Sequence, residues 1–231
     1  MKLYLIPTPI GKGGAAELPQ ENWAVLNSLD YFVVENLRTA RRFIASQKVE
    51  RAIDDMLFGE LSEHTQAQEV EALLEPILQG RDGGLMSEAG LPCVADPGAM
   101  LVEAAHAHGI EVVPLVGASS LMLALMASGA NGQSFAFNGY LPIKDEQRPR
   151  AIKRFEGRAQ SEGQTQIFIE TPYRNTALMA DFLKHCAPKT TLCVAIGLRT
   201  KEESIKVKTI ELWRKNPPKA LPKTPAIFII Y

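Results

Sequence analysis

The sequence is poor in cysteine and contains no long apolar run. Its three cysteines, Cys93, Cys186 and Cys193, are odd in number and show no metal-binding or redox spacing, which predicts buried, reduced thiols in a cytoplasmic protein. No window approaches the roughly 20 apolar residues of a membrane helix. The first apolar run is broken by Pro7 and Pro9 and is shorter than the core of a signal peptide. We therefore expect no export and no membrane partner.

The sequence also lacks an excess of charge and several familiar motifs. The net charge is −1, so no global positive field predicts nucleic-acid binding, although a local basic patch remains compatible with it. Neither a G-x-G-x-x-G pattern nor a P-loop is present, which disfavours dinucleotide and triphosphate binding. His64, His106 and His108 show no ligand spacing, and no Ser–His–Asp or Cys–His constellation can be argued. We therefore assign no metal site.

Short apolar runs alternate with longer segments of helical periodicity, which predicts an α/β fold with a mostly parallel sheet and helices on its faces. The clearest helix is expected over residues 65–78, with Thr65 and Gln68 as a capping box and a kink or late break at Pro76. The turn-rich stretch that begins at Gly129 predicts a boundary between two α/β domains, residues 1–129 and 130–231. The expected strands are residues 3–6, 31–35, 84–87 and 112–115 in the first domain, and residues 135–140, 166–170, 192–196, 204–208 and 227–231 in the second.

Three loops rich in glycine, proline or serine follow predicted strands of the first domain. The longest, residues 87–98 (SEAGLPCVADPG), holds two glycines, two prolines and two carboxylates, and the others are residues 7–14 (PTPIGKGG) and 116–120 (VGASS). Glycine lets a backbone approach a ligand closely, and open α/β sheets bind ligands at the carboxyl ends of their strands. Each loop alone is explained equally well as a surface turn. Three loops at adjacent strand ends predict a shared cleft.

Some charged residues are also candidates. Glu35 ends an apolar strand, where a carboxylate can act as a base, although an ion pair with Arg38 at a helix start is the simpler explanation. Two basic clusters could bind phosphate, although charged helix faces are usually only solvated. The first cluster is Arg38, Arg41 and Arg42, and the second is Lys144, Arg148, Arg150, Lys153 and Arg154.

Six motifs occur in a characteristic order between residues 3 and 174. They are LYLIPTPIG, VVENLR, SEAGLPCVADPG, GIEVVPLVGASSLMLALMASG, FNGYLP and IFIETPYR. Together they resemble the tetrapyrrole methylase superfamily, the class III S-adenosylmethionine-dependent methyltransferases, and within it the bacterial enzymes that methylate the 2′-hydroxyl of a cytidine in 16S ribosomal RNA. The resemblance implies two α/β domains with S-adenosylmethionine in a cleft between them, usually in a homodimer. It also implies ribosomal RNA or the small ribosomal subunit as partner.

The resemblance assigns roles to individual residues. It places Gly11 near the substrate, whereas the need of a ribose hydroxyl for a proton acceptor favours Glu35, with Glu88 as the second candidate, and Arg38 and Arg42 could hold the neighbouring phosphates. The residues that would bind the cofactor are Pro9, Gly90, Leu91, Pro92, Val94, Ala95, Ser119, Ser120, Ile169, Glu170, Ala195, Ile196, Thr224, Pro225 and Ala226.

The chain departs from the ribosomal enzymes at several polar positions. Their PTPIGN, EDTR, SDAGTP, ESPHR and RELTK runs appear here as PTPIGK with Lys12, as ENLR with Asn36 and Leu37, as SEAGLP with Glu88, as ETPYR with Thr171 and Tyr173, and as GLRTK at residues 197–201. The cofactor loops keep their shape, whereas the substrate side differs. Two alternatives therefore stay open: methylation of a small molecule such as a tetrapyrrole precursor, and a non-catalytic homologue that retained the cofactor cleft.

Overall fold

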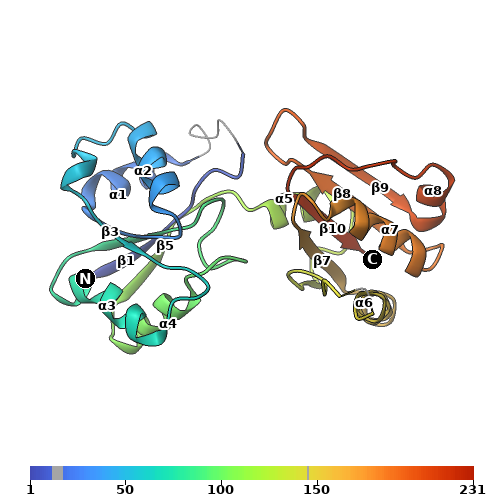
Figure 1. Ribbon diagram of the computed structural model, residues 1–231, viewed down its shortest axis with the longest axis horizontal. Helices are drawn as coiled ribbons and strands as arrows, with labels where there is room; N and C mark the ends of the chain where they lie inside the picture. The colour runs from blue at the N-terminus through green and yellow to red at the C-terminus, as the bar shows by residue number, and fades with distance from the viewer. Residues whose placement is uncertain (12–17, 145) are drawn as a thin grey trace. The chain divides into compact units, whose positions relative to one another are not determined.

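The computed structural model describes residues 1–11, 18–144 and 146–231, which form two compact units. Unit 1 is Met1–Ser119 and unit 2 is Ser120–Tyr231 (Figure 1). This division places helix α5 (Ser120–Ser128) in unit 2, whereas the sequence placed the boundary near Gly129. Lys12 and the rest of the first glycine-rich loop to residue 14 lie outside the described residues.

Unit 1 is built on a sheet that is parallel, as predicted, but has five strands rather than the four expected, in the order β3-β2-β4-β1-β5. Strands β2 and β4 are buried at every residue because helices cover both faces of the sheet (Figure 1). Phe32 and Ile44 belong to the core under α1 and α2, whereas Leu74 and Leu101 belong to the core under α3 and α4. The strands are β1 (Lys2–Ile6), β2 (Tyr31–Val34), β3 (Leu57–Glu60), β4 (Gly83–Met86) and β5 (Glu111–Pro114), and the helices are α1 (Gln20–Ser28), α2 (Leu37–Ser46), α3 (Ala67–Leu78) and α4 (Ala99–Ala107).

The start of α3 differs from the prediction by one residue. Gln66 and Glu69 form the capping box, and the Gln66 N–H donates to Glu69 Oε2 at 2.7 Å. The predicted pair of Thr65 and Gln68 is wrong because Thr65 Oγ1 instead accepts the N–H of Ser62 at 2.9 Å. Pro76 lies in the last turn, and the helix ends at Leu78, which agrees with a late break.

Unit 2 has a mixed sheet with strand order β6-β7-β10-β8-β9. Only β6 and β7 are parallel, and the other neighbours are antiparallel, so the expectation of a mostly parallel sheet is wrong for this unit. Residues 197–203 join β8 to β9, and so short a connection cannot make the crossover that parallel strands need. The strands are β6 (Phe135–Phe137), β7 (Thr165–Glu170), β8 (Thr191–Ile196), β9 (Ser204–Thr209) and β10 (Ala226–Ile230), and the further helices are α6 (Arg148–Glu162), α7 (Asn175–His185) and α8 (Ile210–Lys215).

The core of unit 2 lies between the sheet and helices α6, α7 and α8. Phe168 and Phe228 of the sheet pack with Phe182 of α7 at ring-centroid distances of 5.8 Å, and Trp213 of α8 donates its Nε1–H to Leu192 O at 3.0 Å. Helix α5 packs against β9 and β10. Across the described part of the chain, no helix combines the length and apolar character needed to cross a membrane.

The three cysteines are unpaired, and Cys186 and Cys193 are buried. Burial raises the pKa of Cys186 to about 12 and that of Cys193 to about 11. We expect the folded protein to react slowly with iodoacetamide, first at Cys93, which is only half-buried, and the denatured protein to react at all three thiols. Mass spectrometry of alkylated, unreduced protein measures this. A Cys186–Cys193 bridge in that sample would contradict the prediction.

Candidate functional site

The carboxyl ends of the parallel strands in unit 1 bring the three predicted loops together. Thr8 and Gly90 exchange two backbone hydrogen bonds, at 2.9 and 3.0 Å, and so join the loops after β1 and β4. A Cβ built on Gly117, in the loop after β5, would lie 2.1 Å from Pro7 Cβ and 3.4 Å from Leu91 Cδ2. The contact therefore requires glycine at this position, and the loops after β1, β4 and β5 lie side by side.

The loop of residues 87–98 has an unusual backbone. Gly90 has a φ of 88°, and a Cβ there would lie 3.2 Å from Ile10 Cγ2. Cys93 and Ala95 also have positive φ, 66° and 65°, although each carries a Cβ. The left-handed region costs such residues about 1 kcal/mol each. Strain of this kind accumulates at ligand sites, where the loop conformation is needed for binding rather than for folding.

Three carboxylates gather beside this loop. The N–H of Glu88 donates to Glu35 Oε2 at 3.2 Å, and Thr39 Oγ1 donates to Glu88 Oε1 at 3.0 Å. Burial raises the pKa of Asp96 to about 6; the charges of Glu35 and Glu88 act in the same direction, and the nearby Ser87 hydroxyl opposes them. Asp96 was not predicted as a site residue, because the partial burial that raises its pKa cannot be inferred from the sequence.

The predicted catalytic residues Glu35 and Glu88 thus lie together. In the described part of the chain Glu35 makes no ion pair with Arg38, so the simpler explanation offered for this residue is wrong. Within the same residues, no three His, Cys, Asp or Glu side chains are grouped to hold a metal ion. The arrangement offers carboxylate acceptors for a proton.

Helix α2 places the predicted substrate arginines next to these carboxylates. Asn36 caps the helix, because its Oδ1 accepts the N–H groups of Arg38 and Thr39 at 3.0 and 3.1 Å. The change from Asp to Asn in the ENLR run therefore keeps the cap. Arg38 and Arg42 are exposed, whereas Arg41 pairs with Asp54. The two arginines predicted to contact substrate are therefore the more exposed members of the cluster, and Arg41 is the one held by a carboxylate.

The second basic cluster is partly structural. Arg148 is buried, and its Nε lies 2.9 Å from Asp181 Oδ2. Lys153 Nζ donates to the buried Glu156 at 3.0 Å. The Arg148–Asp181 pair joins α6 to α7, which removes Arg148 as a candidate for phosphate binding, whereas the Lys153–Glu156 pair lies within α6 and leaves the Lys153 side chain 57% exposed.

In unit 2 several predicted cofactor residues lie together at one end of the adjacent strands β7, β10 and β8. Ala226 at the start of β10 pairs with Glu170 on one side and with Ile196 on the other, and the Gly197 N–H donates to Pro225 O at 3.0 Å. The register also brings Ile169 and Ala195 onto Ile227. The Glu170 carboxylate is already engaged, because Arg174 Nε donates to it at 2.8 Å. The Glu170 side chain therefore helps to fix the end of β7 and is not free to contact a ligand.

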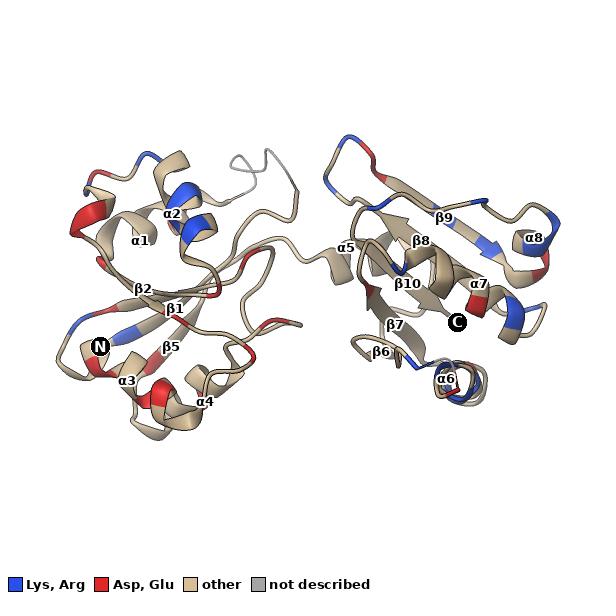
Figure 2. Ribbon diagram, in the orientation of Figure 1, with Lys and Arg blue, Asp and Glu red and all other residues tan. Residues whose placement is uncertain are grey.

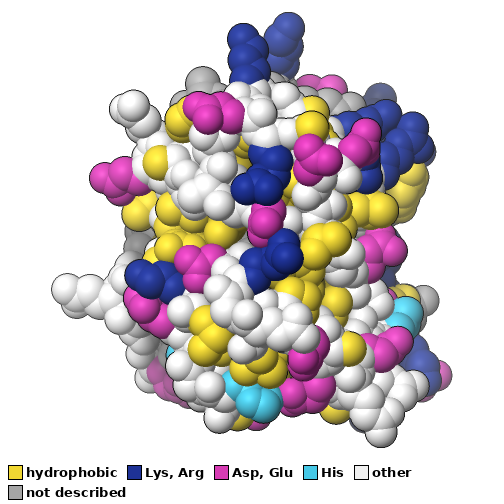
Figure 3. All heavy atoms as spheres, turned by 90° about the vertical axis from the view of Figure 1, so that its left-hand side faces the viewer, with side chains coloured by type: hydrophobic (Ala, Val, Ile, Leu, Met, Phe, Trp, Pro, Cys, Tyr) yellow, Lys and Arg dark blue, Asp and Glu magenta, His cyan; other side chains and the backbone are white. Residues whose placement is uncertain are grey.

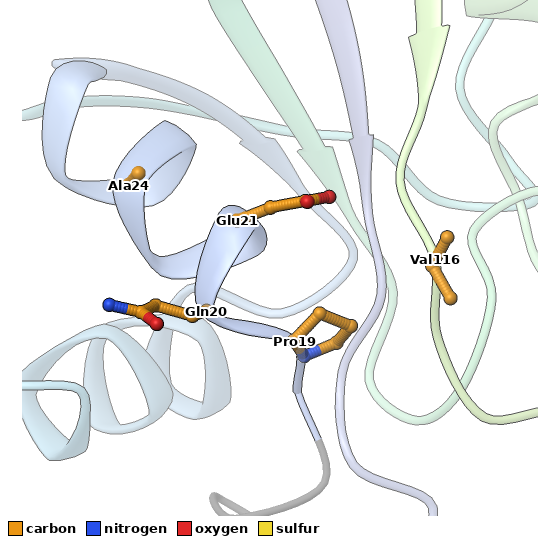
Figure 4. Close-up of a pocket in the computed structure, with 5 residues that line it drawn as sticks. All are labelled: Pro19, Gln20, Glu21, Ala24 and Val116. Atoms are coloured by element: carbon orange, nitrogen blue, oxygen red, sulfur yellow. The ribbon is translucent and has the colours of Figure 1, made fainter.

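The remaining predicted residues lie at the ends of these elements. Ser120 is the first residue of α5, and Ser119 directly precedes it, as expected for a helix N-terminus. A separate pocket lies at the start of α1 (Figure 4), lined by Pro19, Gln20, Glu21, Ala24 and Val116. None of its lining residues was assigned to cofactor or substrate, so the candidate site rests on the contacts between the loops.

The family of the chain follows from comparison with known proteins. The family model described as tetrapyrrole (corrin/porphyrin) methylases matches residues 2–212. The chain belongs to the tetrapyrrole methylase family. Two solved family structures share the fold: the methyltransferase CobJ, with a TM-score of 0.63 and 19% identity over 99% of this chain and 92% of that one, and uroporphyrin-III-C-methyltransferase from Thermus thermophilus, with a TM-score of 0.57 and 18% identity over 99% and 91%. The predicted fold class is confirmed.

Curated relatives within the family carry the name ribosomal RNA small subunit methyltransferase I. The protein from Vibrio cholerae is 34% identical over 181 residues, that from Escherichia coli O157:H7 is 35% identical over 173, and that from Pasteurella multocida is 29% identical over 219. The matches cover 78%, 75% and 94% of this chain and 59%, 57% and 74% of those relatives. The chain therefore spans less than three fifths of the first two relatives.

Proposed function

We propose that the chain is an S-adenosylmethionine-dependent methyltransferase that methylates the 2′-hydroxyl of a cytidine in small-subunit ribosomal RNA. The observation that carries this proposal is the identity of 34% and 35% with proteins named ribosomal RNA small subunit methyltransferase I. The contact between the loops of unit 1 supports it, because these loops carry the family's cofactor motif at the ligand-binding end of a parallel sheet.

The residues of unit 1 fit such a cofactor. Gly90 has a φ of 88°, and a Cβ there would press on Ile10, so glycine lets the loop take this course at the ligand-binding end of the sheet. When bound, S-adenosylmethionine supplies an activated methyl group on its sulfonium. The proposed holding residues in unit 1 are Pro9, Gly90, Leu91, Pro92, Val94, Ala95 and Ser119.

The residues assigned to the cofactor in unit 2 are likewise proposed as binding residues. They are Ser120, Ile169, Glu170, Ala195, Ile196, Thr224, Pro225 and Ala226. The position of the strand residues among them at one end of β7, β10 and β8 supports this assignment, with one restriction. Because the Glu170 carboxylate is held by Arg174 and by the Thr171 N–H at 2.6 Å, the backbone of Glu170 rather than its side chain is left to contact a ligand.

The chain's own part in the reaction is to align the substrate and accept a proton. The bound cofactor would supply the methyl group, and the residues of this chain would hold the ribose hydroxyl in line with it and take up the hydroxyl proton. Holding the oxygen in line supplies a large share of the rate enhancement. Glu35 is proposed to accept the proton, and its contact with the Glu88 N–H orients the carboxylate. Arg38 and Arg42 are proposed to hold adjacent phosphates, with Gly11 beside the substrate.

Methyl transfer to small ribosomal subunits tests the proposed function. With subunits from a strain that lacks this gene and with radiolabelled S-adenosylmethionine, we expect transfer that falls as salt rises, because phosphate contacts release counterions. Glu35→Gln should lower turnover about a hundredfold, within the usual range for a proton acceptor, and leave cofactor affinity unchanged. Glu63→Gln, which alters an exposed glutamate outside the site, is the matched control.

Other outcomes would redirect the assignment. Transfer to a metabolite pool but to no RNA fraction would replace the ribosomal substrate by a small molecule. Cofactor binding without transfer to any acceptor would identify a non-catalytic homologue. Full turnover by Glu35→Gln would remove this residue as proton acceptor, leaving alignment and solvent to complete the reaction.

We also propose that the protein acts in the cytoplasm as a homodimer. The apolar side chain of Met126 on α5 is 79% exposed, and that of Met122 on the same helix is 41% exposed, which supports burial of this helix by a second subunit. Sedimentation of the protein with and without Met126→Glu tests this, and a monomer at all concentrations would contradict it.

A further inference from the structure

The net charge of the chain is −1, but the two units carry large net charges of opposite sign. Residues 120–231 carry 17 Lys and Arg against 9 Asp and Glu, whereas residues 1–119 carry 8 against 17. Unit 2 is therefore basic by 8 charges and unit 1 acidic by 9. Figure 2 shows the basic residues of unit 2 along α6, β9 and α8. On the face of unit 1 in Figure 3, basic and acidic side chains are interspersed. A polyanion is therefore attracted mainly to unit 2.

An exposed aromatic ring lies on this basic unit. The Tyr173 side chain is 82% exposed, the highest value for a large hydrophobic residue in the described part of the chain. Lys223 Nζ lies 5.6 Å from the centre of its ring. A second exposed ring, Tyr140 at 52%, has the Arg174 guanidinium 5.8 Å from its centre. Exposed rings bordered by cations are the arrangement with which proteins bind unpaired nucleotides, because bases stack on the rings while cations hold phosphates.

The loops that carry these side chains are fixed to each other. Asn175 is fully buried and donates to Pro222 O at 3.2 Å and to Thr224 O at 2.8 Å. The Leu221 N–H donates to Thr176 Oγ1 at 3.0 Å. The segment before α7 is thereby tied to the segment before β10, so Tyr173 and Lys223 are held side by side without a ligand. A preorganised pair loses little conformational entropy when it binds.

In the described part of the chain no carboxylate forms an ion pair with Lys223. Glu202 Oε2 accepts the hydroxyl of Thr224 at 2.8 Å, and Glu203 Oε2 accepts the N–H of Arg199 at 2.7 Å. Arg174, by contrast, is paired with Glu170, so its role is to support the Tyr140 ring. Lys223 is therefore the cation beside Tyr173 that is left to hold a phosphate.

We propose that Tyr173 and Lys223 form a stacking site on unit 2 for an unpaired nucleotide of the RNA substrate, with the Tyr140 ring against Arg174, the residue after Tyr173, as a second exposed ring. This inference rests on the proposed function for the identity of its ligand. It places a sequence-tolerant RNA contact on unit 2, in addition to the arginines of α2 in unit 1. The site borders residues proposed to bind the cofactor, since Glu170 and Thr224 are close neighbours of Tyr173 and Lys223 in the sequence.

Binding of two simple probes tests the stacking site in the full chain. The probes are a short single-stranded oligoribonucleotide and inorganic polyphosphate of matched charge, titrated separately at fixed salt. We expect Tyr173→Ala to weaken oligoribonucleotide binding about tenfold, the size of one base–ring stack, and to leave polyphosphate binding unchanged. Tyr173→Phe should bind as the wild type does. Lys223→Gln should weaken binding of both probes and reduce the salt dependence by about one phosphate contact.

Two control variants separate this site from general effects. Phe135→Ala removes a ring that is 38% exposed at the opposite, amino-terminal end of β6, and Lys215→Gln removes a cation already paired with Glu211. Neither should change binding of either probe. Unchanged oligoribonucleotide binding by Tyr173→Ala would overturn the proposal, as would weaker self-association in this variant without a change in RNA affinity, which would assign the patch to a second copy of the chain.

The proposed function and the stacking site can fail separately. If the wild type methylates small ribosomal subunits and Tyr173→Ala does so with unchanged KM, the stacking site is wrong and the function stands. If the wild type methylates no RNA but shows the base-dependent binding lost in Tyr173→Ala, the function is wrong and the site stands. The expected result is a KM for small subunits raised about tenfold in Tyr173→Ala, with kcat unchanged.

Discussion

Replacing Gly90 by valine is expected to weaken binding of S-adenosylmethionine about a hundredfold. The φ of 88° at Gly90 is unfavourable for a β-branched residue, and the new Cβ would lie 3.2 Å from Ile10 Cγ2. The loop must shift, and a shift that costs two hydrogen bonds to the cofactor, each worth about 1–1.5 kcal/mol, gives roughly this loss. Titration calorimetry measures the affinity. Unchanged affinity would move the cofactor away from this loop.

Gly109 provides the matched control for this variant. It also has a positive φ, 69°, but a Cβ there would meet nothing within 4 Å. Gly109→Val therefore introduces similar backbone strain outside the loop, worth about 1–2 kcal/mol of stability, without blocking a ligand. We expect both variants to lose thermal stability and only Gly90→Val to lose cofactor affinity. Equal losses of affinity would mean that general destabilisation, rather than the approach at Gly90, explains the effect.

The sequence predicted most of unit 1 because its signals are local. Strands such as Tyr31–Val34 are continuous apolar runs between turns. The loop of residues 87–98 is recognisable from its glycines and prolines. Strand β3 was missed because its four residues, LFGE, include a glycine and a glutamate and none of them is buried. Helix α8 was missed because six residues, IELWRK, carry too little periodicity to separate a helix from a loop.

The parts that could not be predicted depend on contacts between distant residues. Whether β8 and β9 run antiparallel is decided by strand pairing, which an apolar run does not encode. The exposure of Tyr173 and its distance from Lys223 require the Asn175 side chain to tie two loops together. The separation of charge was present in the sequence but became meaningful only when the boundary at Ser120 defined which residues to count together.

Asp96 is a half-buried carboxyl whose charged form destabilises the fold. Its pKa is raised to about 6 by burial, with the Glu35 charge adding to the effect, whereas an aspartate in an unfolded chain has a pKa near 3.9. The folded state therefore binds the proton more tightly than the unfolded state does. An ionised group that weakens its own fold, at the ligand-binding end of a sheet, is expected to serve binding or catalysis.

Asp96→Asn is expected to stabilise the protein above pH 6 and to impair its activity. In the wild type, the stabilisation due to the protonated carboxyl is complete below pH 4 and is lost as pH rises through 6; for this half-buried group the loss is about 1–2 kcal/mol after solvent screening. Asparagine cannot ionise, so the variant should lack this decline and match the wild type near pH 4.

Urea unfolding between pH 4 and 8 measures this pH dependence of stability, with hydrogen exchange of α4 as a readout within unit 1. The exposed Asp55→Asn should follow the wild-type curve. A variant that is less stable than the wild type at pH 7.5 would show that the charged carboxylate supports the fold, and unimpaired methyl transfer would assign Asp96 no part in the reaction.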